Sequence, residues 1–450
     1  MADFDVRVSG ASGAARGAPD AASSRTAGRP QGVLLALISC LPVLGAVLLA
    51  PVLPRMQDHF AGTPGAEVLV PVALTVPALV VGVLAPFAGS LVDRFGRKRL
   101  LVGALVVYAV FGTAPLWLTG LVPIVISRAG VGITEAAIMT CCTTLIADYF
   151  TGPARDRWLG LQTLSAAVAA TLFFALGGAL GSVSWRVPTV LYASGLVFAV
   201  LAAKLLWQPR PVGDTPSGDT PAGGVPVGGT PAAVPPVPWR TLATPVLVTL
   251  VGGVVFYTPI VELAYVLDGI GVTSVGVIGA VTTLASAATA TGAFVFGRVA
   301  GRGTGTLLPV AFGLAGAGLV VIGTGGGPAT VTAGAVIACA GTGLLLPTLL
   351  TWAVAPLDFA QRGRGTGLWT ASLFLGEFLC PLLVLAVKGV AGGLPTSVGL
   401  VGAVALLLAA GSAAGFRRTA ARPASLPLSI PPGIPPTLPP GIPADKEGTS

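Results

Sequence analysis

The chain has 450 residues, of which 54% are hydrophobic and only 9% are Asp, Glu, Lys or Arg. Soluble domains carry about 25% charged residues, so this composition excludes a soluble globular protein and indicates a membrane protein with many spans. The net charge of +8 comes from basic residues spread over short loops, which argues against a nucleic-acid-binding surface. The five cysteines lie in apolar runs without a metal-binding spacing, and we expect no metal site.

The first part of the chain predicts a six-helix bundle at residues 32–207. Residues 1–31 are polar and predict a disordered cytoplasmic tail. Apolar runs long enough to cross a bilayer then predict membrane spans at residues 32–54, 66–91, 100–119, 121–148, 158–182 and 187–206.

Residues 208–240 separate two hydrophobic halves. Prolines recur there every five residues, from Pro211 to Pro236, and predict an extended cytoplasmic linker without a packed core. A second six-helix bundle is expected at residues 241–416, followed by a proline-rich cytoplasmic tail at 417–450. Its spans are predicted at residues 241–267, 274–299, 304–325, 328–356, 366–388 and 394–416.

The basic residues predict the orientation. With both termini and the linker in the cytoplasm, 21 of the 25 Lys and Arg residues lie on the cytoplasmic side. Arg55, Arg186 and Lys388 then fall in external loops, and Arg128 falls within a span. Positively charged loops stay inside, so we expect a multi-pass protein of the cell (plasma) membrane with both termini in the cytoplasm.

Two short patterns recur in the halves. Arg-x-Arg-x-x-Gly at residues 155–160 returns at residues 362–367, an offset of 207, and Ala-Gly-x-Gly at 129–132 returns at 340–343, an offset of 211. The near-equal offsets predict an all-α protein of 12 transmembrane helices in two pseudo-symmetric six-helix bundles. Parallel repeats of this kind place a substrate site between the bundles, near the middle of the membrane.

A dense charged segment lies between the second and third spans, in the pattern Gly-x-Leu-x-Asp-Arg-x-Gly-Arg-Lys. Here Gly89 and Gly96 predict a helix end and a turn. The pattern resembles the loop 2–3 motif of the major facilitator superfamily, which implies alternating access by a rocker switch. It also implies a cytoplasmic gate in which the acidic residue faces the N-terminus of a helix in the other bundle. The gate residues would be Gly89, Asp93, Arg94, Gly96 and Arg97.

Two further stretches bear on the kind of transport. Residues 50–56, Ala-Pro-Val-Leu-Pro-Arg-Met, are similar to the end of helix 1 in efflux proteins of that superfamily. Its drug antiporters often carry Gly-Pro-x-x-Gly-Gly in helix 5, where this chain keeps Gly177-Gly178 but has Phe173-Phe174 instead of Gly-Pro. This departure argues against drug antiport specifically, although not against transport.

Charges within the spans are the candidate transport and proton-coupling residues, because each costs about 2.5 kcal/mol or more to insert without a partner. Arg128 and Glu135 are two turns apart on one helix face, with Gly132 between them, and predict either a proton or substrate relay or an ion pair that only locks helices. Pro259 predicts a bend in its helix close to a third charged residue, Glu262. The full set is Arg128, Glu135, Glu262 and Glu377.

Four aromatic residues are weaker candidates for contacts with an apolar substrate, although lipid or helix packing explains them as well. These are Phe174, Tyr257, Trp352 and Trp369.

The leading hypothesis is therefore a secondary transporter that exports a small organic compound by alternating access, driven by a proton gradient and without a cofactor. The alternatives are uptake or uniport of a metabolite, and a non-transporting receptor or sensor on the same scaffold. An enzyme is not expected, because no nucleotide loop, metal cluster or nucleophile triad is present in the sequence. The expected partners are the substrate, protons and the bilayer, with no nucleic acid, and we expect a monomer.

Overall fold

The computed structural model describes residues 27–208 and 239–420. The predicted N-terminal tail, linker and C-terminal tail therefore lie almost wholly outside the described residues. The N-terminal half contains α1 (Arg29–Ile38), α2 (Leu41–Val47), η1 (Ala50–Val52), α3 (Leu53–His59), α4 (Ala66–Leu84), α5 (Ala88–Phe95), α6 (Arg97–Thr113), η2 (Ala114–Leu116), α7 (Leu121–Tyr149), α8 (Gly152–Gly181), η3 (Val187–Ala193) and α9 (Ser194–Leu205).

The C-terminal half contains α10 (Trp239–Gly269), α11 (Val275–Val299), η4 (Ala300–Arg302), α12 (Thr304–Thr324), α13 (Pro328–Val354), α14 (Phe359–Ala391) and α15 (Leu394–Ala420). Twelve segments of the described chain are long and apolar enough to cross a membrane. The prediction of an all-helical fold with 12 spans is confirmed. We call the end that carries Gly96 and Gly152 the inner end, following the predicted orientation, and the opposite end the outer end.

Prolines and loop signals account for most differences from the predicted spans. The first span is divided into α1, α2, η1 and α3, with prolines at the first turns of the later pieces. The second span ends at Leu84, and α5 begins after a turn that contains Pro86. The expectation of a helix end at Gly89 was wrong, because this residue lies inside α5. Arg155 falls between the predicted spans 121–148 and 158–182, but it lies on the first turn of α8.

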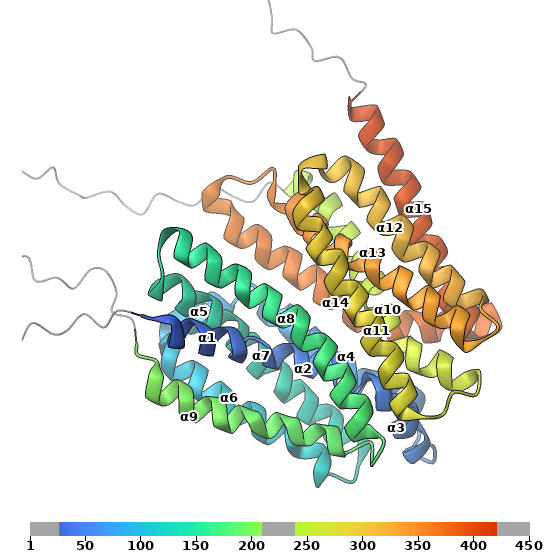
Figure 1. The fold of residues 1–450 in the computed structure, drawn as a ribbon, viewed down its shortest axis with the longest axis horizontal. Coiled ribbons are helices and arrows are strands. Elements are labelled where there is room, and N and C mark those ends of the chain that lie inside the picture. Colours follow the sequence, from blue (N-terminus) through green and yellow to red (C-terminus); the bar gives the residue numbers. More distant parts are fainter. Residues whose placement is uncertain (1–26, 209–238, 421–450) are drawn as a thin grey trace, which may run out of the picture.

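The two halves form two bundles that lie side by side (Figure 1). The recurring patterns occupy equivalent places, since Arg155 and Arg362 are each the fourth residue of their helices, α8 and α14. Gly130 and Gly341 each lie against the helix before their own, α6 and α12 respectively. Gly132 and Gly343 each lie against the membrane span before that one, formed by α4 and α11 respectively. A residue without a side chain lets helices approach closely, and the duplication uses the same approach twice.

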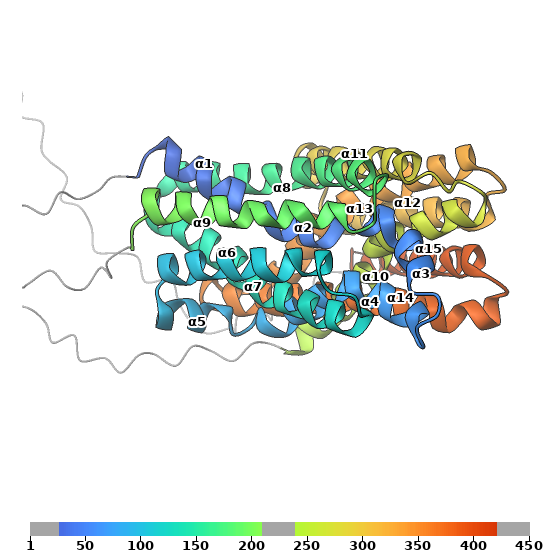
Figure 2. The same cartoon turned by 90° about the horizontal axis from the view of Figure 1, so that it is seen from below.

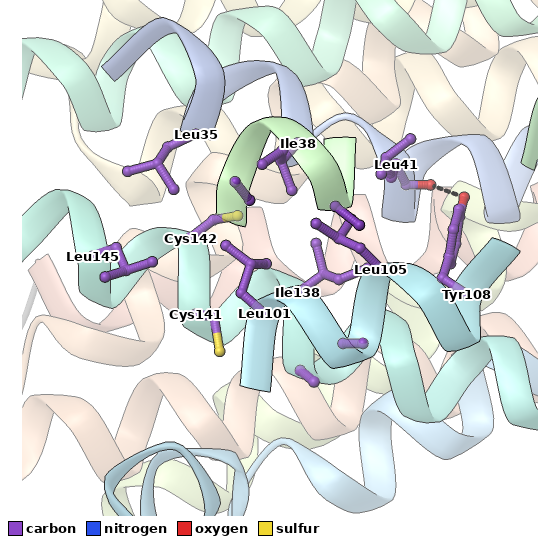
Figure 3. Packing of buried hydrophobic residues seen from close by; sticks show 14 of the residues in the cluster. Leu35, Ile38, Leu41, Leu101, Leu105, Tyr108, Ile138, Cys141, Cys142 and Leu145 are labelled. Atoms are coloured by element: carbon purple, nitrogen blue, oxygen red, sulfur yellow. Dashed lines mark hydrogen bonds between the residues drawn. The ribbon is translucent and has the colours of Figure 1, made fainter. Parts of the chain in front are cut away.

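Three clusters of buried apolar residues hold the structure together. One fills the N-terminal bundle near its inner end, where Leu35, Leu101, Ile138 and Cys142 come from α1, α6 and α7 (Figure 3). A second fills the C-terminal bundle. The third joins the bundles and draws residues from α2 and η1 as well as α10, α11 and α14. Figure 2 shows the helices running lengthwise between the two ends.

The bundles are closed against each other at the outer end. Gly178 of α8 and Gly279 of α11 meet backbone to backbone, and a side chain at either position would strike the other helix. Towards the inner end, no residue of α8 before Ala169 and none of α11 after Gly292 is buried. Figure 1 shows the two helices diverging from their shared end. The arrangement is therefore sealed outside and separated inside along this pair.

Candidate transport site

A cavity of about 380 Å³ lies between the bundles, inward of the outer closure. Its walls come from α2, α4, α7 and α8 on one side and from α10, α11, α13 and α14 on the other. The lining is mostly Leu, Val, Ala, Pro and Phe, with a few hydroxyl groups such as those of Thr282 and Ser286. Glu135 and Glu377 are the charged residues of the described lining, and they come from different bundles.

Glu135 enters the cavity from α7 and is 4% exposed. Its Oε1 atom is buried and has no hydrogen-bond partner within the described residues. Gly45 of α2 provides the space for this carboxyl group, because a side chain at that position would occupy the place of Oε1. An uncompensated carboxylate in an apolar site is costly, so this group requires a proton or a cation to become stable there.

Glu377 enters the same cavity from α14 and is also 4% exposed. Its neighbour Gly376 lies against the backbone of α10 at Leu250 and Gly253, which fixes the height of the glutamate in the bundle. Trp369, two turns earlier on α14, lines the cavity too, and its indole Nε1 is buried without a partner in the described chain. This wall therefore offers one acceptor and one donor in an apolar surface.

The hydrogen bonds of Arg128 lie within the N-terminal bundle. Its guanidinium is fully buried and donates to three groups: Nε to the carbonyl of Ala73 at 3.1 Å, one terminal nitrogen to the carbonyl of Gly45 at 2.7 Å, and the other to the hydroxyl of Tyr192. These acceptors belong to α4, α2 and η3. The guanidinium thus connects three elements of one bundle, and its contacts are not an ion pair with Glu135.

Glu262 lies in a separate pocket of about 210 Å³ at the outer end, also between the bundles. Glu67, Tyr265 and Lys388 line this pocket with it. The three intramembrane carboxylates singled out in the sequence are therefore divided between two sites, one central and one outer. Among residues 27–208 and 239–420, no group of three or more His, Cys, Asp or Glu side chains could hold a metal ion.

The four aromatic candidates are also divided. Phe174, Tyr257 and Trp369 line the central cavity. The hydroxyl of Tyr257 donates to the carbonyl of Ala46 at 2.8 Å, which ties α10 of one bundle to α2 of the other. Trp352 lies elsewhere: it packs against Phe416 on the far side of the C-terminal bundle, with ring centroids 6.0 Å apart. Trp352 therefore lies outside the central cavity, unlike the other three aromatic candidates.

The charged motif of residues 89–99 is docked on its own bundle. Gly96 has φ +80°, a conformation that favours glycine, and it connects α5 to α6. Arg97 pairs with Asp148 at the end of α7, at 3.1 Å. Lys98 donates from its side chain to the carbonyl of Ala203 at 2.8 Å. A short link between two spans is therefore held against the ends of α7 and α9.

The other described residues of the motif make fewer contacts. Arg94 is exposed and lies over the ring of Phe95, and Gly89 is exposed with open space around it. The side chain of Asp93 is outside the described residues, so its predicted contact with the other bundle is not tested.

Three residues of this architecture were not anticipated from the sequence. Gly45 receives Arg128 at its carbonyl and leaves room for Glu135, but it is one of 63 glycines. Tyr192 is a buried acceptor whose neighbour comes from a distant segment. Asp148 offered a signal, because it is an acidic residue at the inner end of a span, on the same side as the basic motif.

Comparison with known families and proteins gives a consistent result. Residues 35–276 match the family model of the Major Facilitator Superfamily. The tetracycline resistance protein of class G from Vibrio anguillarum is 32% identical over 186 residues, which covers 39% of this chain and 44% of the relative. Multidrug resistance protein 1 from Bacillus subtilis (strain 168) is 34% identical over 168 residues, covering 36% and 40%. The matches thus span less than half the length of these relatives.

Solved structures share the fold over nearly their whole length. A bacterial homologue of the human lysosomal transporter Spinster, in an inward-facing and occupied conformation, aligns with a TM-score of 0.68 and 16% identity, covering 87% of this chain and 98% of that one. A D-xylose–proton symporter aligns with a TM-score of 0.67 and 14% identity, covering 85% and 96%. At these identities the likeness concerns the fold alone.

Proposed function

Since the chain belongs to the Major Facilitator Superfamily, we propose that it is a secondary transporter that exports a small organic compound in exchange for protons. The observation that carries the proposal is the meeting of Glu135 and Glu377, one from each bundle, in a single apolar cavity. The similarity to tetracycline and multidrug resistance proteins supports export rather than uptake.

The chemistry of the cavity supports coupling to protons. A carboxylate that faces apolar walls is stabilised either by a bound proton or by a cationic group of the substrate. The two ligands compete for the same oxygen atoms, so binding one favours release of the other. When the bundles rock, the same two carboxyl groups face first one side of the membrane and then the other, which makes the competition an exchange.

The lining also limits the compound. Basic residues do not occur among the described residues that line the cavity, whereas aromatic and aliphatic groups dominate. A volume of about 380 Å³ suits a small ligand with a mainly apolar surface. We therefore expect an apolar compound with one positively charged group, and we expect the proton gradient to supply the energy without a cofactor.

Two further groups have places in this cycle. Glu262, three residues beyond Pro259 on α10, faces the outer pocket and would meet the compound or the proton once the cavity opens outward. Asp93 and Arg97, at the inner end, would act on closure of that end, as the loop 2–3 motif implies. A lysine within the outer pocket, Lys388, offers Glu262 an opposite charge.

Transport into inverted membrane vesicles tests the function. Tetracycline, which the name of the class G relative mentions, and the fluorescent cation ethidium are suitable first compounds within a broader panel. We expect a proton gradient, acid inside, to drive accumulation of a compound, and collapse of the gradient to abolish it. Uptake would appear as the opposite direction of movement, and a receptor would bind a compound without moving it.

Substitutions test whether the two carboxyl groups of the cavity are required for transport. Glu135→Gln and Glu377→Gln should each abolish gradient-driven accumulation while leaving the protein folded. Asp156→Asn, at an exposed acidic residue of α8 that lines neither pocket, is the matched control and should transport normally. Full accumulation by Glu135→Gln would show that this carboxyl group is structural and would remove the basis of the proposal.

A further inference from the structure

A second hollow, of about 660 Å³, lies on the N-terminal bundle near its inner end, apart from the central cavity. The end of α4, the short helix α5, and the facing parts of α6 and α7 enclose it. Its lining is Leu84, Phe87, Ala88, Val92, Phe95, Arg99, Leu100, Gly103, Ala104, Val107, Ile133, Thr134, Ala136 and Ala137. Except for Arg99 and a threonine, the groove is apolar.

The sequence explains why a groove forms here. α4 ends at Leu84, and the chain turns before α5 starts, so α5 stands beside the bundle instead of continuing a transmembrane helix. The floor is made of small residues, Gly103 and Ala104 on α6 with Ala136 and Ala137 on α7. A side chain at Gly103 would meet open space. The hollow is large and mostly apolar, so it offers room for an apolar group from outside the protein.

The groove faces the bilayer. α6 packs on α7 and α9 within its own half, away from the opposite bundle. Several apolar side chains at the rim are exposed: Phe87 at 65%, Phe95 at 55% and Ile133 at 54%. In a protein whose helices cross the membrane, such side chains contact lipid chains rather than water. The occupant therefore comes from the membrane.

A positive charge marks the mouth of the groove. α6 begins with three basic residues and has no acidic residue in its first turn, where the helix dipole already favours an anion. Arg97 is engaged by Asp148, and Lys98 by the carbonyl of Ala203. Arg99 lines the groove, is exposed, and has no hydrogen bond or ion pair with the described chain. A single free guanidinium beside an apolar groove complements an anion that carries a hydrocarbon chain.

We propose that this groove binds an anionic phospholipid of the inner leaflet, with an acyl chain along Gly103 and the phosphate at Arg99. The inner surface of a membrane is negatively charged and attracts basic segments at this depth. A bound lipid fills the space behind α5 and so holds in place the segment that carries Asp93 and Arg97. The proposal does not depend on the substrate or on proton coupling.

Native mass spectrometry of the detergent-solubilised full chain tests this site, with dioleoyl phosphatidylglycerol and dioleoyl phosphatidylcholine as probes. We expect the wild type to retain phosphatidylglycerol in preference. Arg99→Gln should weaken phosphatidylglycerol binding about five-fold, the value of one basic residue near an anionic surface, and leave phosphatidylcholine unchanged. Gly103→Leu, which fills the floor, should weaken both lipids.

Matched controls come from the second half. Arg302→Gln removes an exposed arginine at the corresponding loop, and Gly297→Leu fills an open glycine position on α11. Neither should change lipid binding. Val107→Trp fills the groove from its exposed rim and gives a second test should Gly103→Leu fail to fold. Equal retention of the two lipids by the wild type would overturn the proposal, as would equal losses in the controls or displacement of the lipid by glycerol 3-phosphate.

Discussion

In the N-terminal half, polar side chains cross from helix to helix, whereas the helices of the C-terminal half meet mainly at glycines. Arg128 joins three elements, and the hydroxyl of Tyr108 donates to the carbonyl of Leu41 at 2.7 Å (Figure 3). Arg186 donates to the carbonyls of Pro115 and Leu118 at 2.6 and 2.7 Å. Each bond fixes a distance between two segments that are far apart in the sequence.

Several glycines also make different contacts in the two halves, although Gly132 and Gly343 both lie against a neighbouring backbone. In the N-terminal half, Gly32, Gly112 and Gly130 make room for aromatic rings of neighbouring segments. In the C-terminal half, Gly318 lies against the backbone of α13, and Gly316 lies against the backbone of α15. Small residues let membrane helices approach closely, and hydrogen bonds between them add about 1 kcal/mol or less each. The same helix arrangement is thus stabilised by two kinds of contact.

The two kinds of contact predict different mobility in the two bundles. Three hydrogen bonds from one guanidinium require their acceptors to keep their relative positions, so α2, α4 and η3 must move as one unit. A glycine surface carries no directional bond and tolerates small sliding movements. We infer that the N-terminal bundle behaves as the more rigid partner, which holds Glu135 in place, while adjustments during alternating access concentrate in the C-terminal bundle.

Of the substitutions that test this comparison, removal of Arg128 should cause the largest loss of unfolding free energy. Arg128→Met leaves the carbonyls of Gly45 and Ala73 and the hydroxyl of Tyr192 without their donor. A hydrogen bond to a charged group contributes about 1.5–3 kcal/mol, so we expect a loss of at least about 3 kcal/mol in unfolding free energy. Thermal unfolding followed with a thiol-reactive dye measures it, because all five cysteines are buried and free.

The position of the first reactive cysteine gives a sharper test. Peptide mapping of the labelled protein should find Cys141 and Cys142 of α7 reacting before Cys339 in Arg128→Met. Arg302→Met, an exposed arginine of the other half, should leave the unfolding temperature unchanged. Early labelling of Cys339 in Arg128→Met would show that the two halves do not differ as described.

A methyl group at Gly318 should have the next largest effect. Its Cβ would strike the backbone of α13 near Ala338, and overpacking of this kind costs about 1–3 kcal/mol. The same change at Gly313, also on α12, meets only the Cβ of Ala409 at 4.0 Å and serves as the control. Gly318→Ala should lower the unfolding temperature and expose Cys339 first, whereas Gly313→Ala should be neutral or slightly stabilising. Equal effects of the two changes would refute the role of close glycine contacts.

The fold could be predicted from the sequence because each span must be apolar over its whole length in the bilayer. Helix ends were less predictable. α8 and α14 begin at Gly152 and Phe359, before the apolar runs, since their first turns continue into water and carry arginines there. The first span is divided at three prolines. A hydropathy profile does not show these breaks, because most of the residues around them are apolar.

The site was predicted only in part. Intramembrane carboxylates are rare, so Glu135, Glu262 and Glu377 could be singled out, but their division between two pockets depends on helix rotation and packing. The partners of Arg128 were out of reach for a different reason. Two of them are backbone carbonyls, which every residue has, and the space at Gly45 is visible only when α2 and α7 are placed together.

A single hydrogen bond between helices should contribute a similar unfolding free energy in both halves. Tyr108→Phe removes the donor to Leu41 in the N-terminal half, and Ser372→Ala removes the donor to the carbonyl of Val246 in the C-terminal half. Each should cost about 1 kcal/mol in unfolding free energy. Equal losses would show that the halves differ in the number of such contacts and not in their strength. Thr163→Val, at an exposed hydroxyl that bonds within its own helix, is the control.

The smallest effect on stability is expected at the inner end, where Arg97 and Asp148 pair at 3.1 Å with side chains 28% and 25% exposed. Partly exposed pairs contribute about 0.2–1 kcal/mol, so Arg97→Gln, Asp148→Asn and the double variant should unfold within that range of the wild type. If the pair positions the loop for gating, each single variant should nevertheless slow transport in vesicles several-fold. The double variant should be no worse than either, because both remove the same interaction. Arg302→Gln, in the second half, should transport normally, and an equal loss there would mean that loop charge, and not this pair, governs the rate.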